Sequence, residues 1–254
     1  MESYKSFAEV YDLFMDNVPY DEWAKNITRI LGGYGIKDGL IAELGCGTGQ
    51  MTRRLRDAGY DMIGIDNSIE MLDIARDMEA DLPSDEEARN ILYLCQDMRE
   101  VELYGKVRAV TSFCDSMNYI TEEEDLLEVF RLANNYLDPG GIFLFDMNTV
   151  FKYEKLLGDG VFAENREEGS FIWENEYDPE SKLNYYDLTL YIREGEQYNR
   201  FEEEHVQKAY DRSTVETLLQ KSGLELLEVL DAETLAEPTG ETERIYYIAR
   251  EITK

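Results

Sequence analysis

Three glycines within five residues, Gly45, Gly47 and Gly49, follow a short apolar run that contains Glu43. Glycine tolerates positive φ and lets the backbone lie against a ligand with no side chain between them. A second apolar run ends in Asp66. A strand, a glycine turn, a helix and a second strand that ends in an acidic residue form the layout of a nucleoside-binding βαβ unit. We therefore predict that this turn binds a molecule that contains a nucleoside.

The spacing of the glycines argues against a dinucleotide. In the dinucleotide pattern G-x-G-x-x-G, the third glycine lets the helix pack closely while its N-terminus receives a pyrophosphate. Here the spacing is G-x-G-x-G, and Gln50 stands where that third glycine would be. The shorter spacing suits a nucleoside without phosphates, so we disfavour an NAD-dependent oxidoreductase.

The segments around this turn alternate between strand and helix patterns. We expect strands at 40–44, 62–66, 91–96, 109–113, 142–146, 224–230 and 244–250. We expect helices at 50–58, 68–77, 121–137 and 213–222, and two helical pieces within 1–31. Such alternation predicts a parallel sheet with right-handed crossovers. The expected fold is a Rossmann-like, seven-stranded, mostly parallel sheet with helices on both faces.

The pattern changes in residues 150–210, where aromatic and aliphatic residues alternate with charges. No helical pattern separates these runs, so we predict an inserted antiparallel β sheet. The chain would then comprise N-terminal helices with a ligand-binding core at 1–149, the insertion at 150–210, and the completion of the core sheet at 211–254. The insertion could wall a substrate pocket, form the surface of a homodimer, or serve only packing.

The charge balance narrows the choice of partners. The chain has 25 Lys and Arg against 55 Asp and Glu, a net charge of −30. Such a field repels nucleic acid phosphates and anionic membrane surfaces, and it favours a cationic or neutral small substrate. There is no apolar run of about 18 residues and no basic start followed by an apolar stretch. We expect a cytoplasmic protein that binds neither nucleic acid nor membrane.

Few residues are available for metal or disulfide chemistry. Cys46, Cys95 and Cys114 are odd in number and widely spaced, which indicates reduced thiols. His205 is the only histidine, so a site with several histidines is excluded and we expect no metal. We expect both His205 and the glutamates at 202–204 to be solvated on a strand of the insertion.

Four motifs in order resemble those of class I S-adenosylmethionine-dependent methyltransferases. Residues 43–49 (ELGCGTG) resemble the first motif, and 66–68 (DNS) with the helix after it the second. Residues 95–98 (CQDM) resemble the adenine-side motif, and 137–141 (LDPGG) the turn before the fifth strand. The resemblance covers roughly 4–149 and resumes at 211–250. It implies a methyltransferase whose cofactor is S-adenosylmethionine. The alternative is a catalytically inactive regulatory or scaffold protein that binds the same cofactor.

The resemblance also implies roles for single residues. Glu43 would hold amides or a water near the methionine end, and Gly45 would let the backbone approach the cofactor. Asp66 would accept hydrogen bonds from both ribose hydroxyls. Asp97 would bind the adenine amino group. The residues expected at the cofactor are Tyr11, Tyr20, Trp23, Glu43, Gly45, Cys46, Gly47, Gly49, Asp66, Asn67, Met71, Gln96, Asp97, Met98 and Cys114.

The N-terminal aromatic residues among these are candidates for a lid. In related enzymes a tyrosine in a Tyr-Asp pair reaches the cofactor, and here Tyr11 occupies that place. Tyr20 and Trp23 could cover the cofactor, or simply pack their helix. Some relatives place an arginine on this segment for the cofactor carboxylate, but residues 8–20 contain none. The partner of that carboxylate therefore stays open.

The loop at 114–119 bears on the substrate. In the family's strand order, 3-2-1-4-5 and then a reversed pair, the crevice lies between strands one and four, so this loop faces the glycine turn. It reads CDSMNY, unlike the N-P-P-Y or D-P-P-Y of enzymes that methylate nucleobase amines or glutamine amides. In combination with residues 97–99 (DMR), it is more similar to small-molecule N-methyltransferases, including those that act on amino sugars. We predict in-line methyl transfer to a small molecule at an amine, with Asp115, Tyr119 and Asp146 as candidates to hold or relay a proton.

Overall fold

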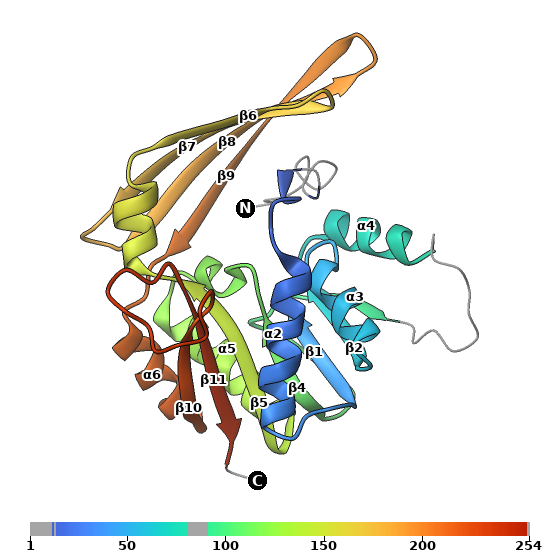
Figure 1. The fold of residues 1–254 in the computed structure, drawn as a ribbon, viewed down its shortest axis with the longest axis vertical. Helices are drawn as coiled ribbons and strands as arrows, with labels where there is room; N and C mark the ends of the chain where they lie inside the picture. The colour runs from blue at the N-terminus through green and yellow to red at the C-terminus, as the bar shows by residue number, and fades with distance from the viewer. Residues whose placement is uncertain (1–11, 13, 81–90, 253–254) are drawn as a thin grey trace.

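Two β sheets organise the computed structural model, which describes residues 12, 14–80 and 91–252. The core sheet has seven strands in the order β10-β11-β5-β4-β1-β2-β3, and the inserted sheet has four in the order β6-β7-β8-β9. Figure 1 shows the inserted sheet above the end of the core sheet where β5 leaves it. The predicted Rossmann-like fold with an inserted antiparallel sheet is confirmed.

The strands of the core sheet are parallel to one another except for β11. These strands are β1 (Leu40–Leu44), β2 (Asp61–Asp66), β3 (Leu92–Cys95), β4 (Val107–Ser112), β5 (Leu137–Asn148), β10 (Leu224–Asp231) and β11 (Arg244–Glu251). Strand β11 runs antiparallel to both β5 and β10. Strand β5 begins at Leu137, earlier than the predicted 142, because Leu137 pairs with Val107 ahead of a register shift.

Helices cover both faces of the core sheet because successive strand residues point to opposite sides. These helices are α2 (Tyr20–Gly33), α3 (Gln50–Asp57), α4 (Ile69–Ala80), α5 (Glu123–Tyr136) and α6 (Arg212–Lys221). In β1, Ile41 packs with α2 and α3, whereas its neighbour Ala42 faces the core formed with α5 and α6. Burial of apolar surface on both faces fixes the carboxyl ends of β1, β2 and β4 next to one another.

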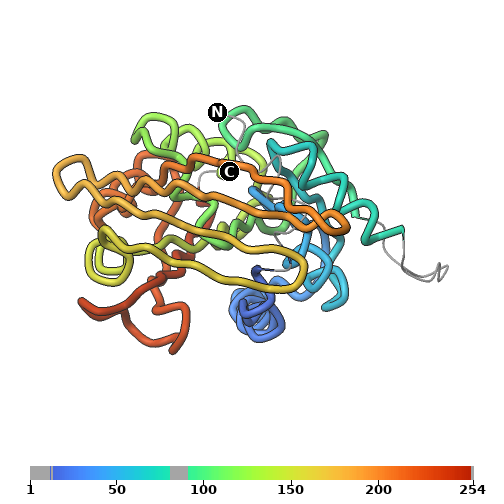
Figure 2. Tube along the Cα trace, turned by 90° about the horizontal axis from the view of Figure 1, so that it is seen from above, coloured from blue at the N-terminus to red at the C-terminus, as the bar shows by residue number. Residues whose placement is uncertain are grey.

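The inserted sheet follows β5 and η2 (Lys152–Leu157), a single π-helical turn. Its strands are β6 (Val161–Asn165), β7 (Gly169–Asp178), β8 (Leu183–Glu194) and β9 (Gln197–Lys208), joined by hairpins. Seen from above in Figure 2, these strands lie across the top of the molecule. Phe14 packs against the sheet face that carries Leu188 and Leu190. Phe14, which precedes α2, therefore covers part of that face.

The prediction that His205 is solvated is wrong, and so is the same prediction for Glu203. His205 is 2% exposed and Glu203 is 8% exposed, whereas Glu202 and Glu204 are exposed. Side chains alternate along β9, and those of odd number share the buried face of the inserted sheet. Opposite His205 on the neighbouring strand lies Tyr186. A buried histidine on this face therefore needs a structural or chemical explanation.

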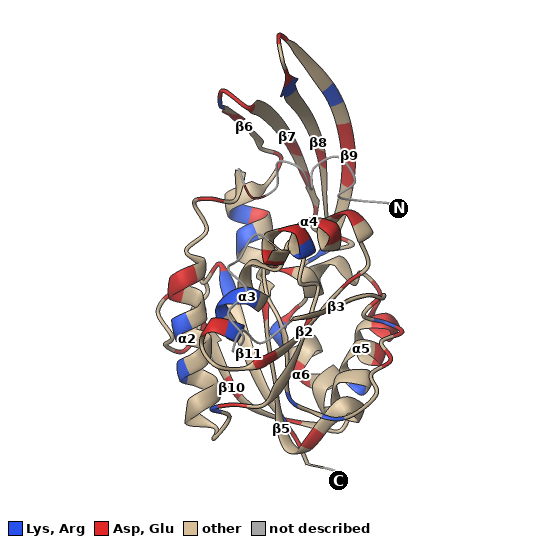
Figure 3. Ribbon diagram, turned by 90° about the vertical axis from the view of Figure 1, so that its right-hand side faces the viewer, with Lys and Arg blue, Asp and Glu red and all other residues tan. Residues whose placement is uncertain are grey.

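Acidic residues outnumber basic residues in the chain, 55 to 25. Figure 3 marks them in red on both sheets and on most helices, in keeping with the net charge of −30. Across residues 12, 14–80 and 91–252, no helix combines the length and the apolar character that a membrane span requires.

Candidate active site

The glycine turn and Asp66 form one hydrogen-bonded unit. Gly45, Gly47 and Gly49 all have positive φ, between +54° and +76°. The amide of Gly47 donates to Asp66 Oδ2 at 2.8 Å, and the amide of Ser68 donates to Oδ1 at 2.9 Å. These two bonds fix the carboxylate at the end of β2 while each oxygen keeps lone pairs for further donors. Asp66 is therefore oriented beside the turn before any ligand binds.

The turn also contacts the loop that follows β4. The hydroxyl of Ser116 donates to the carbonyl of Gly45 at 3.2 Å, in the 3₁₀ turn η1 (Ser116–Tyr119). A Cβ atom on Gly45 would lie 2.5 Å from Ser116 Oγ. Glycine is thus required here for its positive φ and for the close approach of Ser116.

We expect Gly45→Ala to destabilise the protein by about 2–4 kcal/mol, because strain at positive φ adds to a clash with Ser116. Gly35→Ala is the matched control, since Gly35 also has positive φ but no atom lies within 4 Å of the place that its added methyl group would occupy. Urea denaturation should show that Gly35→Ala loses only about 1–2 kcal/mol. Equal losses for the two variants would show that Ser116 gives way freely.

A cavity of about 610 Å³ lies against this turn. The sequence-predicted residues that line it are Tyr20, Glu43, Gly45, Cys46, Gly47, Asp66, Asn67, Met71, Gln96, Asp97, Met98, Cys114 and Tyr119. Trp23, Gly49, Asp115 and Asp146 lie elsewhere, and Tyr11 falls outside the described residues. Glu204 and Val206 of β9 also line the cavity, so the inserted sheet contributes to its wall.

The cavity lining is acidic. Among the described residues that line it, Arg99 is the only basic one, whereas five are acidic: Glu43, Asp66, Glu70, Asp97 and Glu204. Arg99 is itself engaged, because its guanidinium donates to Asp97 Oδ2 at 2.5 Å and holds the pKa of that carboxyl below its usual range. Such a lining favours cationic ligands and disfavours phosphates.

Glu43 is the most deeply buried acid of the lining, at 2% exposure. Burial raises the pKa of its carboxyl to about 8, although Thr52 donates a hydrogen bond to Oε2 at 2.6 Å. The protonated form is therefore favoured at neutral pH in the absence of a ligand. A cation placed beside Glu43 would favour the carboxylate.

A raised pKa for Glu43 has a consequence for stability. The neutral carboxyl group of Glu43 stabilises the folded state at a pH below the ordinary pKa of a glutamate. This stabilisation is lost as the pH rises toward the folded-state pKa of about 8. Between pH 5 and pH 8, without cofactor, we expect the free energy of unfolding of the wild type to fall by roughly 3 kcal/mol relative to that of Glu43→Gln. Urea denaturation at the two pH values measures this. Parallel pH dependence of the two proteins would contradict it.

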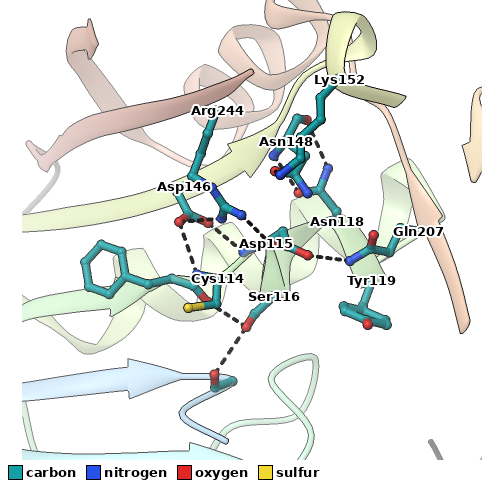
Figure 4. Close-up of polar contacts among 12 residues, drawn as sticks. Cys114, Asp115, Ser116, Asn118, Tyr119, Asp146, Asn148, Lys152, Gln207 and Arg244 are labelled. Carbon is teal, nitrogen blue, oxygen red and sulfur yellow. Dashed lines mark hydrogen bonds and ion pairs between the residues drawn. The ribbon is translucent and has the colours of Figure 1, made fainter. Parts of the chain in front are cut away.

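A buried ion network holds the loop after β4 (Figure 4). Cys114 and Asp115 both adopt positive φ, 59° and 54°, which is unfavourable for residues with a side chain. Their amides donate to the two carboxylate oxygens of Asp146 at 3.1 and 2.8 Å. Arg244 of β11 then bridges Asp146 and Asp115, at 2.8 and 2.7 Å. This network offsets the backbone strain and fixes the loop against β5.

The charge of Arg244 is secured by its two partners. Burial disfavours the charged guanidinium, but the carboxylates of Asp146 and Asp115 outweigh it and raise the pKa of Arg244 well above its usual value. The indole of Trp23 covers the guanidinium at 5.2 Å. Trp23, which we expected at the cofactor, therefore contacts this network.

The same loop is joined to the inserted sheet. Gln207 of β9 donates to Asp115 Oδ2 at 2.7 Å, and Asn118 donates to the carbonyl of Lys208 at 2.8 Å. Figure 4 shows the Tyr119 ring on the side of η1 away from Arg244, and Tyr119 lines the cavity. Asp115 and Asp146 are thus committed to the network, whereas Tyr119 faces the space where a ligand would bind.

Sequence reasoning placed Ser116 only as a member of the loop that faces the glycine turn, and it did not identify Gln207 or Arg244 as part of the site. Their partners lie far away along the chain, as for Arg244 and Asp115, which are 129 residues apart. No local motif marks any of the three. Arg244 sits at the first position of the last strand, where a basic residue is unremarkable.

Known proteins match this chain over nearly its whole length. A family model described as a methyltransferase domain matches residues 41–141. YqeM of Bacillus subtilis (strain 168), which carries a provisional name as a methyltransferase, is 35% identical and aligns with 97% of this chain and 96% of its own. A crystal structure of an S-adenosylmethionine-dependent methyltransferase from Clostridium acetobutylicum ATCC 824 is 30% identical over 98% of this chain and 99% of that one, with a TM-score of 0.86. The chain belongs to the S-adenosylmethionine-dependent methyltransferase family.

More distant methyltransferases share the fold. The sugar N-methyltransferase KedS8 from Streptoalloteichus sp ATCC 53650 is 16% identical, with a TM-score of 0.77 over 96% of this chain and 93% of its own. The alignment with that protein covers nearly the whole chain. Both sheets of this methyltransferase therefore belong to the shared architecture.

The cavity of this methyltransferase suits S-adenosylmethionine. The cofactor carries a sulfonium cation and an ammonium group, and the acidic lining complements both. The lone pairs of Asp66 suit two ribose hydroxyls, because each carboxylate oxygen already accepts one amide and can accept another donor. The bare backbone at Gly47, where an added Cβ would meet no atom within 4 Å, permits close contact with a ligand.

Proposed function

We propose that this methyltransferase transfers the methyl group of S-adenosylmethionine to an amine of a small molecule. The observation that carries the proposal is that Tyr119 and Glu204 of β9 line the same cavity as the glycine turn. A carboxylate there attracts a cationic acceptor, and a phenol can hold an N–H group by its oxygen. The absence of basic lining beyond Arg99, among the described residues, argues against phosphorylated acceptors.

The size of the cavity supports a small acceptor. A volume of about 610 Å³ lies within the range of roughly 300–1,000 Å³ that encloses drug-sized ligands. The cofactor would occupy a large share of it. We infer that residues 150–210 form the acceptor wall, and that only a compact acceptor fits between β9 and the glycine turn.

The chemistry requires alignment more than activation. When bound, S-adenosylmethionine supplies an activated methyl group, which is transferred as the nitrogen lone pair forms the new bond and sulfur keeps the electrons of the old one. Asp66 and the glycine turn hold the donor, and Tyr119 orients the amine. Asp115 and Asp146 act as positioning residues because they hold the loop that carries Tyr119. Exclusion of water by the inserted sheet completes the site.

The likeness to KedS8, a sugar N-methyltransferase by its title, is compatible with an amine acceptor. The direct test is a methyl-transfer screen of small amines, amino sugars and phenols that reads out S-adenosylhomocysteine. We expect turnover with members of the amine set. Turnover confined to phenols would contradict the amine assignment, and binding of the cofactor without any turnover would favour a regulatory protein.

Glu204 should distinguish cationic from neutral acceptors. We expect Glu204→Gln to raise KM for a protonated panel amine about tenfold, since tenfold corresponds to about 1.4 kcal/mol, while cofactor affinity stays within about threefold. Glu202→Gln is the control, because Glu202 is an exposed residue of the same strand that does not line the cavity. Equal KM values for the two variants would remove Glu204 from acceptor binding.

A further inference from the structure

A chain of polar contacts leads from the cavity into the inserted sheet. The hydroxyl of Tyr119, which lines the cavity, lies 2.5 Å from that of Tyr186 on β8. It also lies 3.2 Å from Nδ1 of His205 on β9. On the far side of the imidazole, Nε2 lies 3.3 Å from Oε2 of Glu203. Phenol, imidazole and carboxylate thus follow one another from the cavity inward.

The order of the protons in this chain follows from the chemistry of the groups. The carboxyl group of Glu203 contacts Nε2 without hydrogen-bond geometry, and as a carboxylate it would attract hydrogen on Nε2 and so favour that tautomer of His205. The Nδ1 atom of that neutral imidazole is an acceptor, and the nearby donor is the hydroxyl of Tyr119. Tyr186 can then donate to the Tyr119 oxygen. A phenol oxygen has two lone pairs, so that of Tyr119 can accept from Tyr186 and from a ligand in the cavity.

The surroundings hold the imidazole in place. Tyr186 stacks on His205 with ring centroids 4.5 Å apart and an interplanar angle of 10°, and Trp173 packs against Tyr186. Asn118, next to Tyr119, is hydrogen-bonded to β9 and to β5. Burial of a histidine and a glutamate is unfavourable unless the groups are paired, and an apolar pair would fill the same space more favourably. Packing alone does not explain this pair.

We propose that His205 and Glu203 form a proton relay that acts through Tyr119 during methyl transfer. The inference rests on the proposed amine acceptor. The amine attacks in its neutral form, so an acceptor that binds protonated first loses one proton to solvent. After the new carbon–nitrogen bond forms, the nitrogen carries a positive charge and one proton more than the neutral product. That proton passes to the Tyr119 oxygen while the Tyr119 hydroxyl proton passes to Nδ1 of His205. The products are a neutral methylated amine and an imidazolium paired with Glu203.

The roles of the three residues differ. Tyr119 is the catalytic residue because it lines the cavity and would touch the acceptor. His205 and Glu203 are positioning residues, since they reach the acceptor only through Tyr119. A relay of this kind returns the methylated nitrogen to its neutral form.

The single histidine of the chain makes the tautomer directly measurable. Protein labelled with ¹⁵N-histidine, and freed of any affinity tag, gives one pair of ring-nitrogen resonances. We expect hydrogen on Nε2 and an unprotonated Nδ1, whose resonance shifts in Tyr119→Phe. Tyr185→Phe is the control, because Tyr185 is the exposed neighbour of Tyr186 on the same strand. Hydrogen on Nδ1 would overturn the relay, because the imidazole could not accept the Tyr119 proton.

Kinetics of the panel amine that turns over fastest provides the second arm. We expect His205→Asn to lower kcat about ten- to a hundredfold, within the range of general acid–base catalysis, with KM changed less than about threefold. Calorimetry with S-adenosylhomocysteine should give an unchanged Kd, since His205 does not line the cavity. Glu203→Gln should lower kcat less than His205→Asn does, and it replaces His205→Asn in this test if that variant does not fold. Glu202→Gln is its control.

The outcomes separate the relay from the proposed function. Unchanged kcat in both His205→Asn and Glu203→Gln would overturn the relay while amine methylation stands. A raised KM with preserved kcat would also overturn it, in favour of a packing role. If the wild type methylates no panel amine, the proposed function fails. The NMR measurement is independent of activity, and a proton on Nδ1 of His205 would exclude the hydrogen-bond order that the relay requires.

Discussion

Asp66→Asn is expected to weaken S-adenosylhomocysteine binding at least a hundredfold. A hydrogen bond to a charged group contributes about 1.5–3 kcal/mol, and the remaining lone pairs of Asp66 can accept two such bonds, which we expect from ribose hydroxyls. Its carboxylate also accepts the amides of Gly47 and Ser68, at 2.8 and 2.9 Å. An asparagine would direct an NH₂ group at one of these donors or at the ligand. The variant therefore loses both affinity and the fixed orientation of the turn.

Isothermal titration calorimetry measures this loss. Asp61→Asn is the matched control, because Asp61 is an exposed aspartate at the opposite end of the same strand. It should bind S-adenosylhomocysteine as the wild type does. A Kd for Asp66→Asn within about threefold of the wild type, in a variant with an unchanged thermal transition, would mean that Asp66 does not bind the ribose.

Arg244→Met is expected to destabilise the protein by about 3–5 kcal/mol, the range found when one partner of a buried ion pair is removed. Asp146 has no exposed surface, and Asp115 depends on the same guanidinium. Methionine preserves much of the packing against Trp23 but leaves both carboxylates uncompensated. The loop that carries Tyr119 should then loosen, so methyl transfer should fall as well.

Urea denaturation at neutral pH tests the effect of Arg244→Met on stability. Arg250→Met is a suitable control on the same strand, since Arg250 lies over the ring of Tyr34 at 5.6 Å, outside the buried network. It should cost less than about 1 kcal/mol. A similar small loss for Arg244→Met would indicate that water or a rearranged loop satisfies the two carboxylates.

Local features of the site could be predicted from the sequence. The glycine turn and Asp66 are close in the chain, and their conformation depends on backbone geometry that only certain residue types allow. The core sheet was predictable for the same reason, because strand and helix periods alternate regularly. The early start of β5 at Leu137 was missed, since it depends on pairing with Val107.

Interactions between distant segments could not be predicted. The contact between Arg244 and Asp146 joins residues 98 positions apart, and no sequence motif indicates that these two residues pair. The buried side of β9 is set by what packs against the inserted sheet, so a period of two along the strand does not reveal that His205 is inside. Tyr119 was a candidate from its loop alone, but its partners on β8 and β9 were not.

The most direct test of the account locates the transferred methyl group. Wild-type protein is incubated with S-adenosylmethionine that carries a ¹³C-methyl group and with the panel of amines, amino sugars and phenols, and the products are analysed by ¹³C NMR and mass spectrometry. We predict that the labelled carbon is bonded to nitrogen of an acceptor, and that Asp66→Asn yields none of this product under the same conditions. Label on oxygen or carbon, or no labelled acceptor while the cofactor binds, would contradict it.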